Sequence, residues 1–172
     1  MRLMMLQQAD EALIRMVSGH GRWGWVVLAR LLSRSGDGLL YPLVGLAAWQ
    51  WGGEVGATFL LLALVAFAIE RPLYLILKNS LRRHRPAERL AGVAAVVEPS
   101  DRFSLPSGHT AGAFVMATLL TTSWPSLALP LFGWAAAVGW SRVMLRVHFP
   151  ADVLIGAAIG TAVALAVVEA AA

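Results

Sequence analysis

Three short segments of the chain combine residue types that bind and transfer a phosphoryl group. They are Lys78 followed after six residues by Arg85-Pro86, then Pro106-Ser107-Gly108-His109, and finally Ser141-Arg142 followed by His148 and Asp152. Lysine and arginine neutralise phosphate oxygens, and arginine can do so through two parallel hydrogen bonds. We therefore predict that Lys78, Arg85 and Arg142 bind a phosphate.

The second segment has the features of a helix start. Pro106 is of a type favoured at a first helical position, and the free N–H groups and dipole of a helix N-terminus bind anions. Gly108, which has no side chain, would let a phosphate approach the backbone closely. We predict that Ser107 and Gly108 complete the phosphate site.

The third segment could supply a nucleophile. The four-residue offset lets Asp152 accept a hydrogen bond from one ring nitrogen of His148, which leaves the other nitrogen free to attack phosphorus. A phosphohistidine would then divide the hydrolysis into two steps. His109 is the remaining acid–base group and is placed to protonate the leaving oxygen.

The composition indicates a membrane protein. Hydrophobic residues make up 58% of the 172 residues and charged residues 14%, against about 25% charged residues in soluble domains. This excludes a disordered chain and a soluble nucleic-acid-binding protein, and no nucleic-acid partner is expected. Because the chain has no cysteine, thiolate nucleophiles and cysteine-type metal sites are also excluded.

Long uncharged stretches predict an all-α, multi-span transmembrane bundle of five to six membrane helices. With polar ends included, the predicted spans are 38–52, 55–78, 106–123, 126–145 and 151–169. Alternation then puts the polar segments 79–105 and 142–150 on one side of the membrane, where the three motifs can form one site. Pairs of glycines four residues apart, Gly108/Gly112 and Gly156/Gly160, predict close helix packing.

Two regions follow from this pattern. Residues 1–36 are predicted to be an amphipathic segment in the membrane interface, because Arg30 and Arg34 would be costly inside lipid; a first spanning helix is the alternative. Residues 37–172 are predicted to form the membrane-embedded catalytic bundle.

The motifs K-x6-RP, PSGH and SR-x5-H-x3-D resemble those of the type 2 phosphatidic acid phosphatase (PAP2) superfamily. All eleven fixed positions match within residues 78–152, and the chain is similar to small bacterial membrane members that act on undecaprenyl diphosphate or phosphatidylglycerophosphate. The resemblance implies a helical core and a metal-independent site without a cofactor. It also implies His148 as nucleophile, Asp152 as its support and His109 as general acid, with the phosphate held by Lys78, Arg85, Ser107, Gly108 and Arg142.

The predicted function is an integral membrane lipid phosphatase that acts through a phosphohistidine intermediate. Undecaprenyl diphosphate is the expected substrate by analogy with small bacterial relatives, and phosphatidylglycerophosphate and phosphatidic acid remain open. The alternatives are a non-catalytic or transporting protein that binds lipid phosphates, and a vanadate-dependent haloperoxidase, although those enzymes are large and soluble. The sequence does not predict the oligomeric state.

The remaining predictions concern the membrane face on which the site lies and the roles of residues outside the motifs. The concentration of basic residues on the motif side favours a cytoplasmic site, whereas the resemblance favours the periplasmic face of the inner membrane. We predict that the site lies on the periplasmic face. Glu70 shares a helix face with Lys78 and is hypothesised to orient it or another cation of the site. Residues predicted to contact lipid headgroups are Arg82, Arg83, Arg89, Arg102 and Arg146, and His20 and His84 are predicted to be structural.

Overall fold

The computed structural model describes residues 2–19 and 23–172, and this part of the chain is helical with no strand. The all-α prediction is therefore confirmed for the described residues, and His20 lies outside them. The helices are α1 (Arg2–Gly19), α2 (Trp23–Ser35), α3 (Leu40–Trp51), α4 (Gly53–Leu81), α5 (Pro86–Arg89), α6 (Gly108–Ser123), α7 (Ala128–Met144) and α8 (Pro150–Ala171), with a 3₁₀ turn at Pro125–Leu127 before α7.

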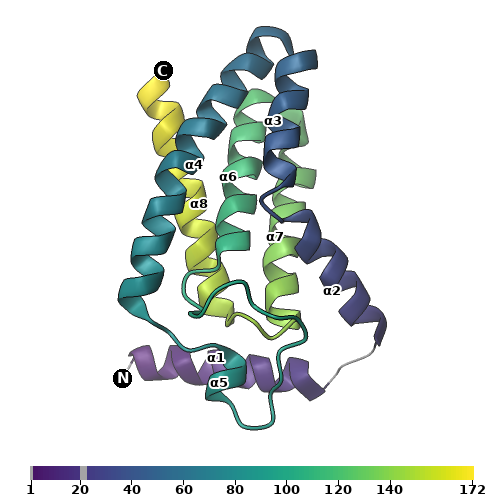
Figure 1. The fold of residues 1–172 in the computed structure, drawn as a ribbon, viewed down its shortest axis with the longest axis vertical. Helices are drawn as coiled ribbons and strands as arrows, with labels where there is room; N and C mark the ends of the chain where they lie inside the picture. The colour runs from purple at the N-terminus through teal and green to yellow at the C-terminus, as the bar shows by residue number, and fades with distance from the viewer. Residues whose placement is uncertain (1, 20–22) are drawn as a thin grey trace.

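The long helices form a bundle, and α1 lies across one end of it (Figure 1). Helix α6 is the most buried element: an almost unbroken run from Thr110 to Leu119 is inaccessible to solvent. The main core joins this helix to α4 and α8 through Phe59, Met116 and Val163. Because α6 is enclosed, its N-terminus is held firmly at the end of the bundle where α1 lies.

Close packing of α6 against α8 depends on two glycines. A Cβ atom on Gly156 would lie 2.6 Å from the Ser107 carbonyl oxygen, and one on Gly160 would overlap the Ala111 carbonyl. The predicted role of this pair in helix packing is therefore confirmed. The contact also places the start of α8 beside the start of α6.

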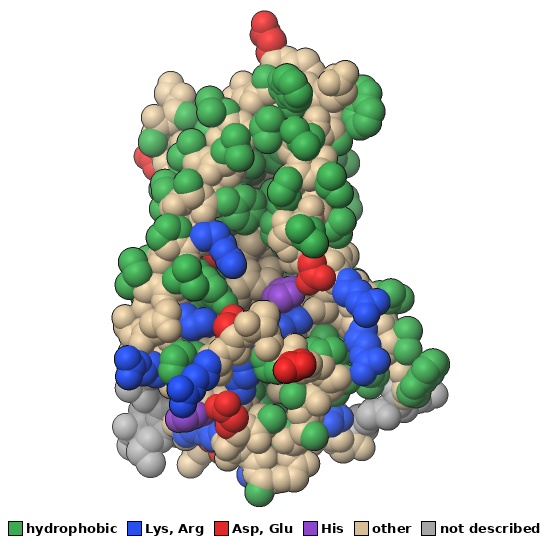
Figure 2. All heavy atoms as spheres, in the orientation of Figure 1, with side chains coloured by type: hydrophobic (Ala, Val, Ile, Leu, Met, Phe, Trp, Pro, Cys, Tyr) green, Lys and Arg blue, Asp and Glu red, His purple; other side chains and the backbone are tan. Residues whose placement is uncertain are grey.

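Within residues 2–19 and 23–172, three segments are long and apolar enough to cross a membrane: Gly53–Arg89, Pro125–Met144 and Pro150–Ala171. Helices α3 and α6 have 12 and 16 residues, fewer than the about 20 that one crossing requires. A total of five to six spans therefore stays a prediction. Figure 2 shows that apolar side chains cover the upper part of the visible face, whereas charged side chains gather toward the lower end.

The first 36 residues contribute two helices instead of one continuous segment. Helix α1 packs on the bundle through Ile14, which is buried with Leu90, Val93 and Phe149. Asp10 of the same helix is 5% exposed. The N-terminal region thus covers the charged end of the bundle, and its placement in a membrane interface stays a prediction.

Candidate active site

The structure brings the three motifs together at the end of the bundle that α1 covers. Lys78 lies in the last turn of α4, Arg142 in the last turn of α7, and His109 in the first turn of α6. Arg85 directly precedes α5, and His148 lies in the short loop before α8. Five separate segments therefore supply the candidate site.

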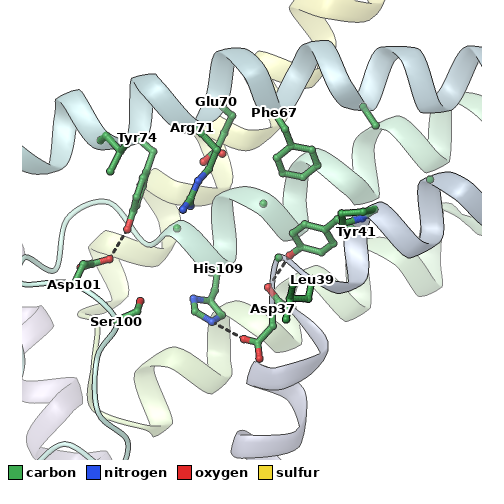
Figure 3. A pocket seen from close by; sticks show the side chains of 18 of the residues that line it. Asp37, Leu39, Tyr41, Phe67, Glu70, Arg71, Tyr74, Ser100, Asp101 and His109 are labelled. Atoms are coloured by element: carbon green, nitrogen blue, oxygen red, sulfur yellow. Dashed lines mark hydrogen bonds and ion pairs between the residues drawn. The ribbon is translucent and has the colours of Figure 1, made fainter.

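A cavity of about 970 Å³ opens on four of these residues, Arg85, His109, Arg142 and His148 (Figure 3). Its polar end is lined by Arg85, Asp101, His109, Arg142 and His148. From there it continues between α3 and α4 along an apolar wall formed by Leu39, Gly45, Leu60, Leu64 and Phe67. The cavity thus joins a cationic end to an apolar groove.

The three predicted phosphate ligands are almost fully buried, with Lys78, Arg85 and Arg142 at 3–5% exposure. Lys78 Nζ and Arg85 Nη2 each donate to Asp101 Oδ1 at 2.7 Å. Arg142 donates to Ser33, and its Nε atom has no hydrogen-bond partner in the described part of the chain. Two of the three cations therefore share one loop carboxylate.

Asp101 was not identified from the sequence, because one aspartate in a polar loop carries no motif. Its Oδ2 atom accepts a hydrogen bond from Tyr74 at 2.5 Å. Partial burial opposes ionisation, but the hydrogen bonds from Lys78 and Tyr74 outweigh it and hold the pKa of Asp101 at about 2. The carboxylate is thus ionised and lies where two cations would otherwise face a phosphate.

His148 is oriented differently from the prediction. Its Nδ1 atom lies 2.6 Å from the Ser104 carbonyl oxygen, whereas the nearest Asp152 oxygen is 3.8 Å away. The predicted hydrogen bond from His148 to Asp152 is therefore wrong. The Ser104 carbonyl takes the Nδ1 atom of His148, while Asp152 accepts hydrogen bonds from the Phe149 backbone N–H at 2.8 Å and from Arg83 at 2.6 Å.

The Ser104 carbonyl can nevertheless perform the task that was expected of Asp152. A carbonyl oxygen only accepts hydrogen bonds, so it requires the proton of His148 on Nδ1 and leaves Nε2 with a free electron pair. Burial, reinforced by the nearby Arg85 and Arg142 charges, lowers the pKa of His148 to about 4. The ring is therefore neutral at physiological pH.

Arg83 joins α1 to the third motif. It donates to Asp152 Oδ1 and to Asp10 Oδ2, both at 2.6 Å, and Asp10 also accepts the Ala151 backbone N–H at 3.0 Å. The prediction that Arg83 contacts lipid headgroups is wrong. Arg82, in the left-handed conformation with a φ of 48°, ends α4, and the chain that follows directs Arg83 toward the interior.

Two other arginines that were predicted to contact headgroups have protein partners. Arg89 pairs with Glu11 at 2.9 Å, and Arg146 donates to the backbone carbonyls of Ala94 and Ser18 at 3.4 Å. For Arg82 and Arg102, which are exposed, headgroup contact stays a prediction. His84 forms an exposed pair with Glu88 at 3.0 Å.

His109 faces an aspartate from the loop between α2 and α3. Its Nε2 atom lies 3.0 Å from Asp37 Oδ1, and Figure 3 shows this pair beside the cavity. Asp37 was missed because 72 residues separate it from the histidine. The contact gives the predicted general acid a partner that can orient its ring.

The phosphate-binding role of Ser107 and Gly108 stays a prediction, but their surroundings differ from those expected. The helix begins at Gly108 instead of Pro106, and the Ser107 N–H donates to the Asp152 carbonyl at 3.0 Å, so it is not free for an anion. A Cβ atom on Gly108 would lie 2.8 Å from the Tyr74 ring. Close packing of Tyr74 therefore already requires glycine at this position, whether or not a phosphate approaches.

Glu70 does not orient Lys78, which donates to Asp101 and to the Tyr74 hydroxyl, the latter at 2.6 Å. The other half of the hypothesis, that Glu70 orients another cation of the site, stays a hypothesis, and the charge of Arg71 interacts with the Glu70 carboxylate. The Glu70 side chain is 1% exposed, and its Oε1 atom has no hydrogen-bond partner among the described residues. It lines the cavity beside Arg71.

Two curated proteins are similar in sequence to part of this chain. Decaprenylphosphoryl-5-phosphoribose phosphatase from Mycobacterium tuberculosis is 32% identical over 105 residues, or 59% of this chain and 52% of the relative. The bacitracin transport permease protein BcrC from Bacillus licheniformis is 33% identical over 108 residues, or 60% and 51%. The chain thus spans about half the length of these curated relatives.

Two crystal structures have the same fold over nearly the whole chain. The PAP2-type phosphatidylglycerolphosphate phosphatase from Bacillus subtilis superimposes with a TM-score of 0.78 and 28% identity, covering 96% of this chain and 85% of that one. LpxE from Aquifex aeolicus gives a TM-score of 0.81 and 29% identity, covering 92% and 93%. The family model described as the PAP2 superfamily matches residues 54–171. Since this match covers about two thirds of the sequence and includes all three motifs, the chain belongs to the PAP2 superfamily.

Proposed function

We propose that this protein is an integral membrane phosphatase that removes a terminal phosphate from a lipid phosphate or diphosphate. The observation that carries the proposal is the shape and lining of the cavity. Two histidines and two arginines line its polar end, and an apolar groove leads away from them between α3 and α4. This arrangement suits a substrate with an anionic head and a long apolar tail.

Binding of the head would use the buried cations. Lys78, Arg85 and Arg142 neutralise the phosphate oxygens, and Asp101, which now accepts from the first two, must move aside or share them. The Gly108 end of α6 adds the positive end of a helix dipole. No metal or cofactor has a step in this mechanism, and phosphate release in the presence of EDTA tests that part of the proposal.

The reaction would proceed in two displacements. His148 Nε2 attacks the phosphorus while the bond to the leaving oxygen breaks, and His109 donates a proton to that oxygen. Asp37 holds the ring of His109. Asp152, whose nearest oxygen lies 3.8 Å from His148 Nδ1, stabilises the positive charge that develops near His148. Water then cleaves the phosphohistidine and releases inorganic phosphate.

The apolar groove would accommodate the lipid tail. Its walls are formed by Leu60, Leu64 and Phe67 of α4 facing Gly45 of α3, and the absence of a side chain at Gly45 keeps the two helices close. Undecaprenyl diphosphate is the proposed substrate, with phosphatidylglycerophosphate and phosphatidic acid as the other candidates. The name of the mycobacterial relative, which specifies a decaprenylphosphoryl compound, supports a polyprenyl tail.

We also propose that the protein is a multi-pass protein of the cell membrane with its site on the periplasmic face. Glu54 opens α4 at the end of the bundle opposite to the site, and Arg89 lies at the site end. Because the chain has no cysteine, single cysteines at these positions can be labelled separately in intact cells. A membrane-impermeant reagent should label residue 89 and not residue 54; the opposite result would place the site in the cytoplasm.

The decisive experiment on activity uses the purified full-length protein in detergent or vesicles. We expect it to release phosphate from a panel of lipid phosphates and diphosphates with EDTA present, and we expect His148→Ala to abolish this release. Brief incubation with ³²P-labelled substrate should leave acid-labile label on the wild type but not on His148→Ala. Transport of a lipid phosphate that survives the His148→Ala change, without phosphate release by the wild type, would refute the phosphatase proposal.

A further inference from the structure

Arg71 is a cation inside the apolar part of α4 that the proposed mechanism does not use. Arginine within a membrane segment is costly unless it is paired or serves a function. Its side chain is exposed and lines the cavity, and Figure 3 shows it extending from α4 into that space. Its Cζ atom lies 5.1 Å from the centroid of the Tyr74 ring, and its charge also interacts with the carboxylate of the neighbouring Glu70.

The same tyrosine ring also contacts a cation of the phosphate site. Lys78 Nζ lies 4.5 Å from the Tyr74 centroid, so Arg71 and Lys78 are less than about 10 Å apart. Charge-assisted hydrogen bonds of about 2.8 Å at each end would then leave at most roughly 4 Å between the oxygens that the two cations bind. Oxygens on two linked phosphates can lie within this range, so both cations can reach one diphosphate group.

The position of Arg71 along the cavity is equally informative. It lies between the apolar wall that ends at Phe67 and the polar end that holds Arg85 and His148. The part of a lipid substrate that joins its terminal phosphate to its tail must therefore pass Arg71. In a lipid monophosphate this part is the uncharged ester linkage, whereas in a lipid diphosphate it is a second, negatively charged phosphate.

We propose that Arg71 binds the second phosphate of a lipid diphosphate and makes this class the preferred substrate. The inference rests on the proposed phosphatase function and specifies its substrate class. As the bond from His148 Nε2 to the terminal phosphorus forms, the bond from that phosphorus to the bridging oxygen breaks, and the electron pair stays on the bridging oxygen. The leaving group is then a lipid monophosphate, and Arg71 neutralises its increasing charge.

The test compares two substrates that have the same tail, farnesyl diphosphate and farnesyl monophosphate. Phosphate release by the purified full-length protein gives kcat/KM for each substrate. A lost charge-assisted hydrogen bond corresponds to a rate factor of about 10 to 100. We therefore expect Arg71→Gln to lower kcat/KM for the diphosphate by at least about tenfold, with less than about a twofold change for the monophosphate.

Two further variants act as controls. Arg71→Lys retains the charge and should retain most of the preference for the diphosphate. Arg102→Gln removes an exposed cation whose recorded contact is the Phe103 ring, and both rates should remain unchanged. Size-exclusion profiles and melting temperatures of all variants report whether the fold is intact.

The results separate this inference from the proposed function. An equal loss on both substrates in Arg71→Gln, or no loss on either, would overturn the role of Arg71 while leaving the phosphatase function intact. A wild-type protein that prefers the monophosphate would do the same. A wild-type protein that releases phosphate from neither substrate would overturn both.

Discussion

Replacement of Asp101 by asparagine tests whether this carboxylate occupies the phosphate site when no substrate is bound. The substitution keeps the shape of the side chain but removes the charge that accepts hydrogen bonds from Lys78, Arg85 and Tyr74. Two effects should follow. The protein should lose stability in the absence of ligand, and its unpaired cations should bind inorganic phosphate more tightly.

The magnitude follows from the pKa of Asp101. Folding lowers this pKa from 3.8 to about 2, which corresponds to about 2 kcal/mol of stability at neutral pH. Because the folded pKa is the lower one, this contribution is complete above about pH 4 and disappears as the pH falls toward 2. For a chain of this size, ~2 kcal/mol lowers the melting temperature by about 4–8 °C.

The assay is thermal unfolding in detergent at pH 7, with and without inorganic phosphate. Asp101→Asn should melt at a lower temperature than the wild type, and phosphate should raise its melting temperature by more. Glu98→Gln removes an exposed acid from the same loop and serves as the matched control, which should behave like the wild type. If Asp101→Asn is as stable as the wild type and gains no more from phosphate, Asp101 does not occupy the anion site.

Three further predictions concern the histidines and the residues that position them. The ring of His148 should titrate near pH 4 in NMR spectra of the ¹³C-labelled protein, and a titration near 6.5 would contradict the buried, neutral ring. Arg83→Gln leaves Asp152 without its cation and should lower kcat by about 10- to 100-fold with little change in KM. Arg83→Lys should recover part of this loss. An unchanged kcat in Arg83→Gln would mean that the pair of Arg83 and Asp152 is only structural. Asp37→Asn should slow the release of a lipid alcohol more than that of p-nitrophenol, because only the poorer leaving group needs a proton from His109, and equal losses would argue against this role.

The sequence was sufficient to name the residue types that the proposed reaction requires and their order along the chain. Phosphoryl transfer through a histidine requires cations, a nucleophilic ring and an acid, and Lys78, Arg85, His109, Arg142 and His148 occur at spacings that restrict them to helix ends. Long apolar runs likewise predicted a helical bundle, since period and hydrophobicity are local properties of the chain. The helices begin and end within a few residues of the predicted bounds, because these bounds depend on the same local pattern.

Only the tertiary structure determined how these groups are held. The partner of His148 is the carbonyl of Ser104, which any residue type could supply, so no sequence pattern could reveal it. Asp10 reaches Arg83 across 73 positions and Asp101 reaches Lys78 across 23. Such contacts depend on how distant segments pack, and a carboxylate in a surface helix or a loop looks the same in sequence whether it faces water or a buried cation. The residue types thus specified the chemistry, whereas the packing of distant segments selected the carboxylates and the carbonyl that orient it.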